Sequence, residues 1–346
     1  MIKKITRILL LSTAVLAIFW LIASLALVFW PAPKFTNPTP SATGNNLKTV
    51  VVPDNLLTGE TAQFRMRDGT ILKARCFASD SPVDVLFLHG VMGNARECAE
   101  TCRRIREMTG AEVFALDLRG HGESGGVPGD INYIGQYEDD VSDVMATLRK
   151  RKSCRYIILA GHSMGGGIAL RYAAAHKKPA ADSYFLFAPL LGSKSPTART
   201  ESADGQKTRG EAFMKLNLPR TIGLMMLNAV GIRWLNGHPT LLFNVPPKFP
   251  IHAYSYRAMA SMAPGDYVAA LKADAKPLLV IAGKNDEAFR AEHFASVIGI
   301  HKNGETEIID GESHNSILHS TAALDAVANW MRRIPEATIK SIGQDK

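Results

Sequence analysis

Apolar residues open the chain as one long run, from Ile8 to Trp30, without a single charged side chain. About 20 such residues cross a bilayer as a helix. A cleavable signal peptide has a shorter apolar core, about 7–15 residues, followed by a small-residue cleavage site. Here the run ends in Phe29-Trp30-Pro31, and aromatic residues suit the membrane interface. We therefore predict an uncleaved signal anchor over residues 1–30, with residues 8–30 in the membrane; a cleaved signal peptide is the alternative.

The next segment is polar and rich in proline. Residues 31–50 hold four prolines among Thr, Ser, Asn and Gly, which is typical of a stalk between a membrane and a folded domain. From about Thr61, polar and apolar residues alternate across the turn Arg67-Asp68-Gly69 and on to Cys76. This alternation predicts a β-hairpin.

Beyond the hairpin the pattern changes to short apolar runs that alternate with helical periodicity. Continuous apolar runs are typical of strands buried on both faces of a parallel sheet. Strands that alternate with helices predict an α/β fold with helices on both sides of that sheet. The expected strands are 83–88, 111–116, 156–160, 184–190, 277–282 and 306–309, and the expected helices are 94–108, 133–150 and 163–176.

The rhythm breaks between Leu191 and Ala263. This stretch begins polar and Gly/Ser-rich and then becomes apolar, and it is far too long for a loop between neighbouring elements. We predict a helical cap over 191–263, inserted into an α/β domain formed by 51–190 and 264–340.

Charge indicates the orientation of the anchor and argues against one class of partner. The net charge is +8, and Lys3, Lys4 and Arg7 precede the apolar run. The positive-inside rule keeps these cations in the cytoplasm, so the domain would lie on the non-cytoplasmic side, in the periplasm of a bacterium or a secretory lumen of a eukaryote. No dense Lys/Arg run suggests nucleic acid.

The cysteines and other potential ligands suggest no metal or cofactor. Such a compartment permits disulfides, but four cysteines allow three pairings between which the sequence cannot choose. Cys98 and Cys102 fall one turn apart on a predicted helix, which fits small buried side chains. Cys-x3-Cys without nearby paired histidines is weak support for zinc, and the Gly-x-Gly stretches lack the context of a dinucleotide-binding fold.

A nucleophile motif follows the strand expected at 156–160. Gly161-His162-Ser163-Met164-Gly165 matches G-x-S-x-G and precedes a helix. A sharp strand-to-helix turn strains the serine backbone and projects its hydroxyl, and the glycines keep neighbouring side chains out of the turn. We predict that Ser163 is a catalytic nucleophile.

A serine nucleophile needs a base, and the base needs a carboxylate. His314 follows the last expected strand, and Asp286 follows the strand before it. The order Ser163, Asp286, His314 is the chain order of one class of serine hydrolases. Glu287 is an alternative acid, and Asp310 lies closer to His314 in sequence but at a strand end.

The negative charge of an acyl-transfer intermediate needs two backbone N–H donors. One is expected from Met164, directly after the nucleophile, and the other from the loop His89-Gly90-Val91-Met92-Gly93. We assign the second to Val91. His89 is expected to shape that loop through hydrogen bonds rather than to take part in catalysis.

Five motifs follow one another along the chain: Leu88-His89-Gly90, Asp117-Leu118-Arg119-Gly120-His121-Gly122-Glu123-Ser124, Gly161-His162-Ser163-Met164-Gly165-Gly166, Gly283-Lys284-Asn285-Asp286 and Ser313-His314. Together they resemble the α/β-hydrolase superfamily, in particular its branch of monoacylglycerol lipases, lysophospholipases and serine aminopeptidases. The resemblance covers about residues 60–333 and implies an eight-stranded, mostly parallel sheet with a cap after the sixth strand. It also implies that the second motif is structural.

The composition of the insertion favours a lipidic substrate. Between Leu191 and Ala263 there are nine basic and three acidic residues, whereas an aminopeptidase needs acidic groups to hold the free amine of its substrate. Apolar residues with excess positive charge suit an acyl chain with an anionic head group. We therefore predict an esterase acting on lysophospholipid-like or monoacylglycerol-like esters without a cofactor. Thioester or amide hydrolysis is the alternative, and a non-catalytic, membrane-tethered binding protein is the second.

Overall fold

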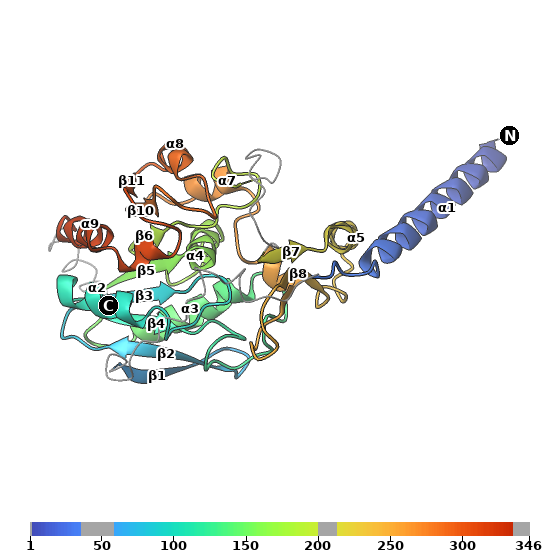
Figure 1. Ribbon diagram of the computed structural model, residues 1–346. Coiled ribbons are helices and arrows are strands. Elements are labelled where there is room, and N and C mark those ends of the chain that lie inside the picture. The colour runs from blue at the N-terminus through green and yellow to red at the C-terminus, as the bar shows by residue number, and fades with distance from the viewer. Residues whose placement is uncertain (1, 36–58, 200–212, 335–346) are drawn as a thin grey trace. The chain divides into compact units, whose positions relative to one another are not determined.

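The computed structural model describes residues 2–35, 59–199 and 213–334 (Figure 1). They belong to two compact units. The sheet unit comprises the described parts of 44–207 and 260–346, and the insert unit comprises those of 1–43 and 208–259.

The sheet unit is built on an eight-stranded sheet in which every strand except β2 runs in the same direction. Its order is β1-β2-β4-β3-β5-β6-β10-β11, and β2 pairs antiparallel with both of its neighbours. The mostly parallel, eight-stranded sheet expected from the resemblance is confirmed. The strands are β1 (Glu60–Arg65), β2 (Ile71–Phe77), β3 (Val83–Leu88), β4 (Glu112–Leu116), β5 (Tyr156–His162), β6 (Ser183–Phe187), β10 (Leu278–Gly283) and β11 (Gly304–Ile309).

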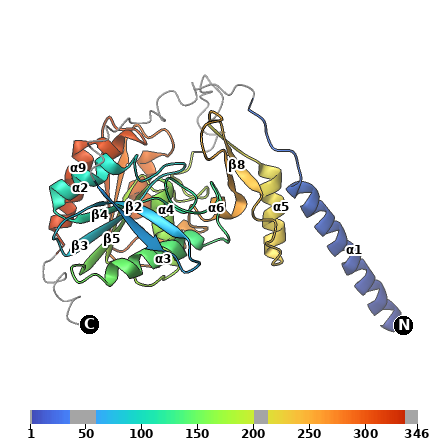
Figure 2. The ribbon, with the colours of Figure 1, turned by 90° about the horizontal axis from the view of Figure 1, so that it is seen from below.

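Helices cover both faces of this sheet (Figures 1 and 2), so the central strands are buried on both sides. Every residue of β4, β5, β6 and β10 is buried, whereas the edge strand β11 is partly exposed. This accounts for the unbroken apolar runs in the sequence. The helices of the unit are α2 (Ala99–Thr109), α3 (Gln136–Arg149), α4 (Met164–Ala174), α7 (Tyr267–Lys272), α8 (Phe294–Ile298) and α9 (Thr321–Arg332), with the short 3-10 helices η3 (Ala291–His293) and η4 (Ser316–His319).

Two of these helices share one apolar core with the sheet. α2 packs beside α9, and Ile105 and Trp330 are buried between the helices and the strands. The Trp330 ring meets the Phe185 ring edge-on, with 6.5 Å between centroids. The other face is covered by α3 and α4, which contact each other. The sheet is thereby held rigidly, and the loops at the carboxyl ends of its strands are free to carry chemistry.

The insertion differs from the expected helical cap. It contains a three-stranded antiparallel sheet as well as helices: β7 (Met214–Leu216), α5 (Leu218–Ala229), β8 (Pro239–Phe243), β9 (Ala253–Ser255) and α6 (Tyr256–Ala260). The sheet buries Leu241 and Phe243, and the Phe243 ring contacts the Tyr254 ring edge-on at 5.1 Å. Strands of three residues are too short for their alternation to be recognised in a sequence.

The limits of the insertion also differ from 191–263. The inserted part of the second unit is narrower, 208–259. Residues before it belong to the sheet unit, where Ala198 forms a β-bridge with Phe289 and the Arg199 guanidinium donates to the carbonyl oxygen of Asp286 at 2.8 Å.

The N-terminal run forms a single helix, α1 (Ile2–Val28). It is long and apolar enough to cross a membrane, and by length and composition a signal sequence would pass the same test. Of the expected stalk over 31–50, residues 36–50 lie outside the described residues.

Candidate active site

Ser163 occupies a strained turn between β5 and α4. Its backbone has φ 52° and ψ −112°, a conformation that costs free energy for a residue with a side chain and is typical of functional sites. The turn is tight because glycines surround it. A Cβ on Gly165 would stand 2.2 Å from the carbonyl oxygen of Leu88, and one on Gly161 would stand 2.6 Å from the carbonyl carbon of Gly165.

Backbone hydrogen bonds hold the strained serine in place. Its N–H donates to the carbonyl oxygen of Phe187 at 2.9 Å, and its own carbonyl oxygen accepts from the N–H groups of Gly167 at 3.0 Å and Leu190 at 2.9 Å. The side chain lies at the carboxyl end of β5, at the amino end of α4. A helix amino end favours negative charge developing nearby.

Asp286 and His314 meet at the carboxyl ends of the neighbouring strands β10 and β11. The distance from His314 Nδ1 to Asp286 Oδ2 is 2.9 Å. Asp286 is 1% exposed, and its other oxygen accepts from the backbone N–H groups of Ala288 at 2.8 Å and Phe289 at 2.7 Å. The Phe289 ring packs edge-on against the His314 ring at 5.0 Å. The carboxylate is thus oriented by its own loop, and it fixes the orientation of the imidazole.

Two further side chains hold the loop that carries His314. The Glu287 carboxylate accepts from the His314 backbone N–H at 3.0 Å, and His162 Nε2 lies 2.9 Å from the His314 carbonyl oxygen. A carbonyl can only accept, so Nε2 of His162 carries the proton. Burial lowers the pKa of His162 to about 3, so this imidazole is neutral.

The contact between His162 and the His314 carbonyl oxygen could not be predicted from the sequence, since nothing in G-x-S-x-G indicates where its second residue points. Glu287, the neighbour of Asp286, was the alternative acid in the sequence. It binds the backbone of His314, whereas Asp286 binds the ring of His314.

The loop that contains Val91 lies next to the serine. A Cβ on Gly90 would stand 3.5 Å from the Cβ of Ser163 and 2.9 Å from Nδ1 of His162. His89 shapes this loop: its Nδ1 donates to the Gly90 carbonyl oxygen at 2.8 Å, and its Nε2 accepts from the Leu118 N–H at 3.1 Å. Burial lowers the pKa of His89 to about 4, so the ring is neutral.

The segment from Asp117 to Ser124 is structural, as the resemblance implied. The carboxylate of Asp117 accepts from the backbone N–H groups of Ala95 at 2.6 Å and Glu123 at 2.9 Å. Arg119 is 3% exposed and forms a two-pronged ion pair with Asp140 at 2.6 and 2.8 Å. These bonds tie the segment to the loop after β3 and to α3, so both side chains are engaged in holding the fold.

The predicted residues therefore fall into two groups. Asp286 and His314 are in contact, and Ser163 adjoins His162, whose ring lies 4.7 Å from the His314 ring. Among the described residues, no hydrogen bond to the Ser163 hydroxyl is found. In enzymes without a bound substrate, catalytic hydrogen bonds are often long and tighten only when the substrate is in place.

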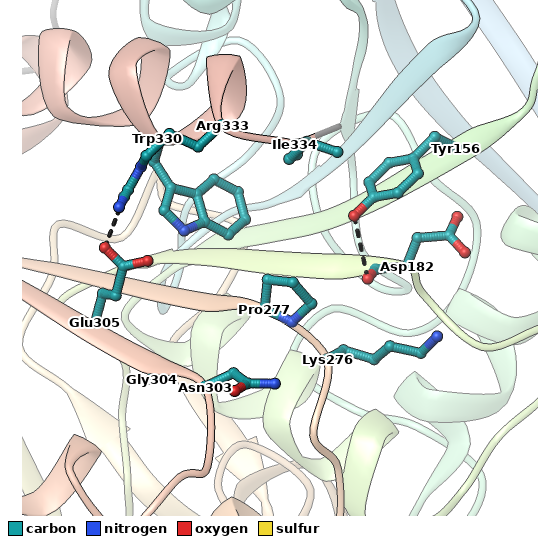
Figure 3. A pocket seen from close by; sticks show the side chains of 10 residues that line it. All are labelled: Tyr156, Asp182, Lys276, Pro277, Asn303, Gly304, Glu305, Trp330, Arg333 and Ile334. Atoms are coloured by element: carbon teal, nitrogen blue, oxygen red, sulfur yellow. Dashed lines mark hydrogen bonds and ion pairs between the residues drawn. The ribbon is translucent and has the colours of Figure 1, made fainter. Parts of the chain in front are cut away.

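A cavity of the sheet unit lies at the amino ends of the strands. It measures about 470 Å³ and is lined by Tyr156 and Gly304, the first residues of β5 and β11, and by Trp330 near the end of α9 (Figure 3). Ser163 follows the carboxyl end of β5, so this cavity and Ser163 lie at opposite ends of the strands.

The described residues suggest no metal centre. They contain no group of three His, Cys, Asp or Glu side chains arranged to hold a metal ion. The four cysteines, all within the described ranges, are free thiols.

Comparison with a family model gives a match over residues 83–318, and the model describes "Serine aminopeptidase, S33". Among curated proteins, the "Putative non-heme haloperoxidase" of Mycobacterium phage D29 is 30% identical over 147 residues, 42% of this chain and 48% of that protein. The "Monoacylglycerol lipase" of Mycolicibacterium smegmatis is 32% identical over 90 residues, 26% of this chain and 32% of that protein. The chain thus spans about half the length of the first relative and about a third of the second.

Comparison with solved structures shows the fold. The crystal structure of the "Alpha/beta hydrolase GrgF" from Penicillium sp. sh18 superposes with a TM-score of 0.56, at 18% sequence identity, over 79% of this chain and 98% of the other. The α/β-hydrolase fold expected from the motifs is confirmed.

Proposed function

The chain belongs to the serine aminopeptidase S33 family and is an α/β hydrolase, and from this premise we propose that it is a membrane-anchored serine esterase acting on lipidic esters. The observation that carries the proposal is the strained turn of Ser163, at φ 52°, beside the buried Asp286–His314 pair. A positive φ at a serine is costly and persists where its surroundings impose it. It is the backbone that a nucleophile in this fold requires.

In the proposed reaction, the Ser163 hydroxyl oxygen attacks the ester carbonyl carbon while His314 Nε2 takes its proton. The oxyanion that forms accepts hydrogen bonds from the backbone N–H groups of Val91 and Met164. His314 then gives the proton to the departing alcohol, which leaves an acyl-enzyme. Water attacks the acyl group, His314 takes its proton, and the acid departs as Ser163 is restored.

The composition of the insert unit supports a lipidic ester. Its described inserted part, 213–259, contains no acidic residue and five basic ones: Lys215, Arg220, Arg233, Lys248 and Arg257. This charge suits an anionic head group such as that of a lysophospholipid. The description of the family as serine aminopeptidases makes amide hydrolysis the second candidate.

Membrane anchoring by α1 is part of the proposal. Three cations precede its apolar run, so the sheet unit would lie on the non-cytoplasmic side, which is the periplasm in a bacterium. Retention of α1 is supported by its packing against the insertion, where Gly223 lies against Ser24 and Val28. A cleaved signal peptide has no such partner in the mature protein.

The test is a substrate series with the full chain in detergent micelles. p-Nitrophenyl esters from acetate to palmitate are compared with aminoacyl p-nitroanilides, with Ser163→Ala as the control. We expect ester turnover that rises with acyl length and disappears in the variant. Faster turnover of the anilides would replace the ester proposal with the amidase one. No turnover of either class, without labelling by a fluorophosphonate, would leave a binding protein.

A further inference from the structure

The last turns of α1 pack directly against α5, and both helices belong to the insert unit (Figures 1 and 2). Gly223 lies at the closest approach: a Cβ on it would stand 2.6 Å from the Ser24 carbonyl oxygen and 2.8 Å from the Val28 nitrogen. Ser24 and Val28 are fully buried, although only 6% of the apolar window of α1 is buried. Only glycine allows the two helices to approach this closely.

α5 also supplies the cap for the carboxyl end of α1. The last carbonyl groups of a helix lack partners within the helix and carry partial negative charge, and the last turn of α1 has no basic residue of its own. The Arg220 guanidinium donates to the carbonyl oxygens of Val28 at 2.8 Å and Trp30 at 3.2 Å. The contact is therefore specific in hydrogen bonding as well as in shape.

The outward face of α5 is apolar. Leu218, Ile222 and Met225 follow each other at helical spacing and are 55%, 41% and 56% exposed. Val230 and Trp234, just beyond the helix, are 58% and 78% exposed. Exposed apolar side chains at helical spacing mark an interaction site. α1, against which α5 packs, also exposes large apolar side chains.

The position of α5 along α1 determines the depth at which this face would lie. A helix of 27 residues is about 40 Å long at about 1.5 Å per residue, and the hydrocarbon core of a bilayer is about 30 Å thick. α5 contacts the final turn of α1, so it would lie where hydrocarbon gives way to head groups. Amphipathic helices lie in that layer with their apolar side down.

Charge indicates which lipids the insert unit would meet. The five basic residues in 213–259 are not balanced by any acidic residue. A cationic segment beside an apolar face is attracted to anionic phospholipid.

We propose that α5 is a second membrane element, held beside the anchor α1 through Gly223 and Arg220, and that its face of Leu218, Ile222, Met225, Val230 and Trp234 is embedded in an anionic phospholipid bilayer. This inference rests on the proposed anchoring by α1. It makes the insertion a membrane-bound part of the protein.

Site-specific fluorescence in the full chain tests the proposal. An environment-sensitive thiol label is attached to Met225→Cys on α5, to Val15→Cys on α1, and to Val127→Cys, an exposed apolar position of the sheet unit. Cys98 and Cys102 are buried, and burial raises the pKa of the Cys76 and Cys154 thiols to about 12, so the native cysteines react slowly. The proteins are reconstituted in phosphatidylcholine vesicles with and without phosphatidylglycerol, and spin-labelled lipid serves as the quencher.

We expect lipid quenching and a blue shift at 225 as at 15, with neither at 127, and stronger quenching at 225 when phosphatidylglycerol is present. A label at 225 that behaves like the one at 127, while 15 is quenched, would overturn the inference and leave the anchor intact. Absence of quenching at 15 as well would overturn both. A blue shift at 225 without lipid quenching would mean that protein covers this face, and equal quenching in both lipids would refute the preference for anionic lipid.

Discussion

Gly165→Ala tests whether the close approach of two loops at Ser163 is required. The added methyl group would stand 2.2 Å from the Leu88 carbonyl oxygen, 2.6 Å from the Leu88 carbonyl carbon and 2.8 Å from the His89 carbonyl oxygen. Ordinary contact begins at 3.4 Å. All three obstacles are backbone atoms, so no side-chain rotation relieves the overlap, and the backbone must shift by about 1 Å.

Two effects of different size are expected from this shift. Overpacking of a rigid site costs about 1–3 kcal/mol, and the backbone contacts favour the upper end of that range. At about 2–4 °C per kcal/mol, the melting temperature should fall by about 6–12 °C. The displaced segment leads into the loop with Val91, and misplacing a catalytic group by about 1 Å costs about 10²-fold in rate.

The assay separates the two effects. The rate constant for fluorophosphonate labelling is measured well below the melting temperature, where the folded fraction is complete, and melting is followed separately. The control is Gly265→Ala, because a Cβ at Gly265 would meet nothing within 4 Å. A Gly165→Ala protein that labels and melts like the control would refute the requirement for close approach.

Three further predictions concern the histidine loop. Asp286→Asn should lower kcat about 10⁴-fold because His314 loses the carboxylate that orients it. Glu287→Gln should lower kcat about 10-fold or less, since it weakens a single hydrogen bond. Comparable losses of kcat in the two variants, measured by steady-state kinetics, would contradict these roles. His162→Leu removes the donor to the His314 carbonyl oxygen and should lower kcat about 10-fold at unchanged KM. His162→Gln keeps an N–H at that position and should recover most of the rate. A change in KM alone would refute the role of His162 in positioning His314. The folded pKa of His162 is about 3 against an ordinary 6.5, so its neutral form stabilises the fold fully above pH 6.5, and that stability is lost as the pH falls toward 3. Relative to His162→Gln, the wild type should therefore lose about 1.4 kcal/mol of unfolding free energy per pH unit below 6.5, and a pH-independent difference in urea unfolding would contradict this.

Much of the sheet unit could be predicted because its strands are short apolar runs and several motifs in the loops after them point to the same fold. The buried strand β5 is continuously apolar, and the motif after it requires a strand-to-helix turn whose glycines the structure explains by contacts as short as 2.2 Å. Asp286 and His314 could be paired because each lies in the loop after a parallel strand, and neighbouring parallel strands bring their carboxyl ends together.

What could not be predicted depends on contacts between distant segments. The bond from His162 to the carbonyl oxygen of residue 314 joins positions 152 residues apart, and the bond from Arg220 to Val28 joins positions 192 apart. The small sheet of the insertion was missed because β7 and β9 have three residues each, fewer than periodicity needs. In the sequence alone, Gly223 is a residue of low helix propensity, and its contact with α1 cannot be predicted.

In the proposed reaction, Ser163 forms the covalent intermediate. The most direct measurement is the mass of the full chain after reaction with a fluorophosphonate, followed by peptide mapping and repeated with Ser163→Ala. We expect one adduct per chain, located on Ser163, and none in the variant. An adduct on another residue, or undiminished labelling of Ser163→Ala, would contradict it.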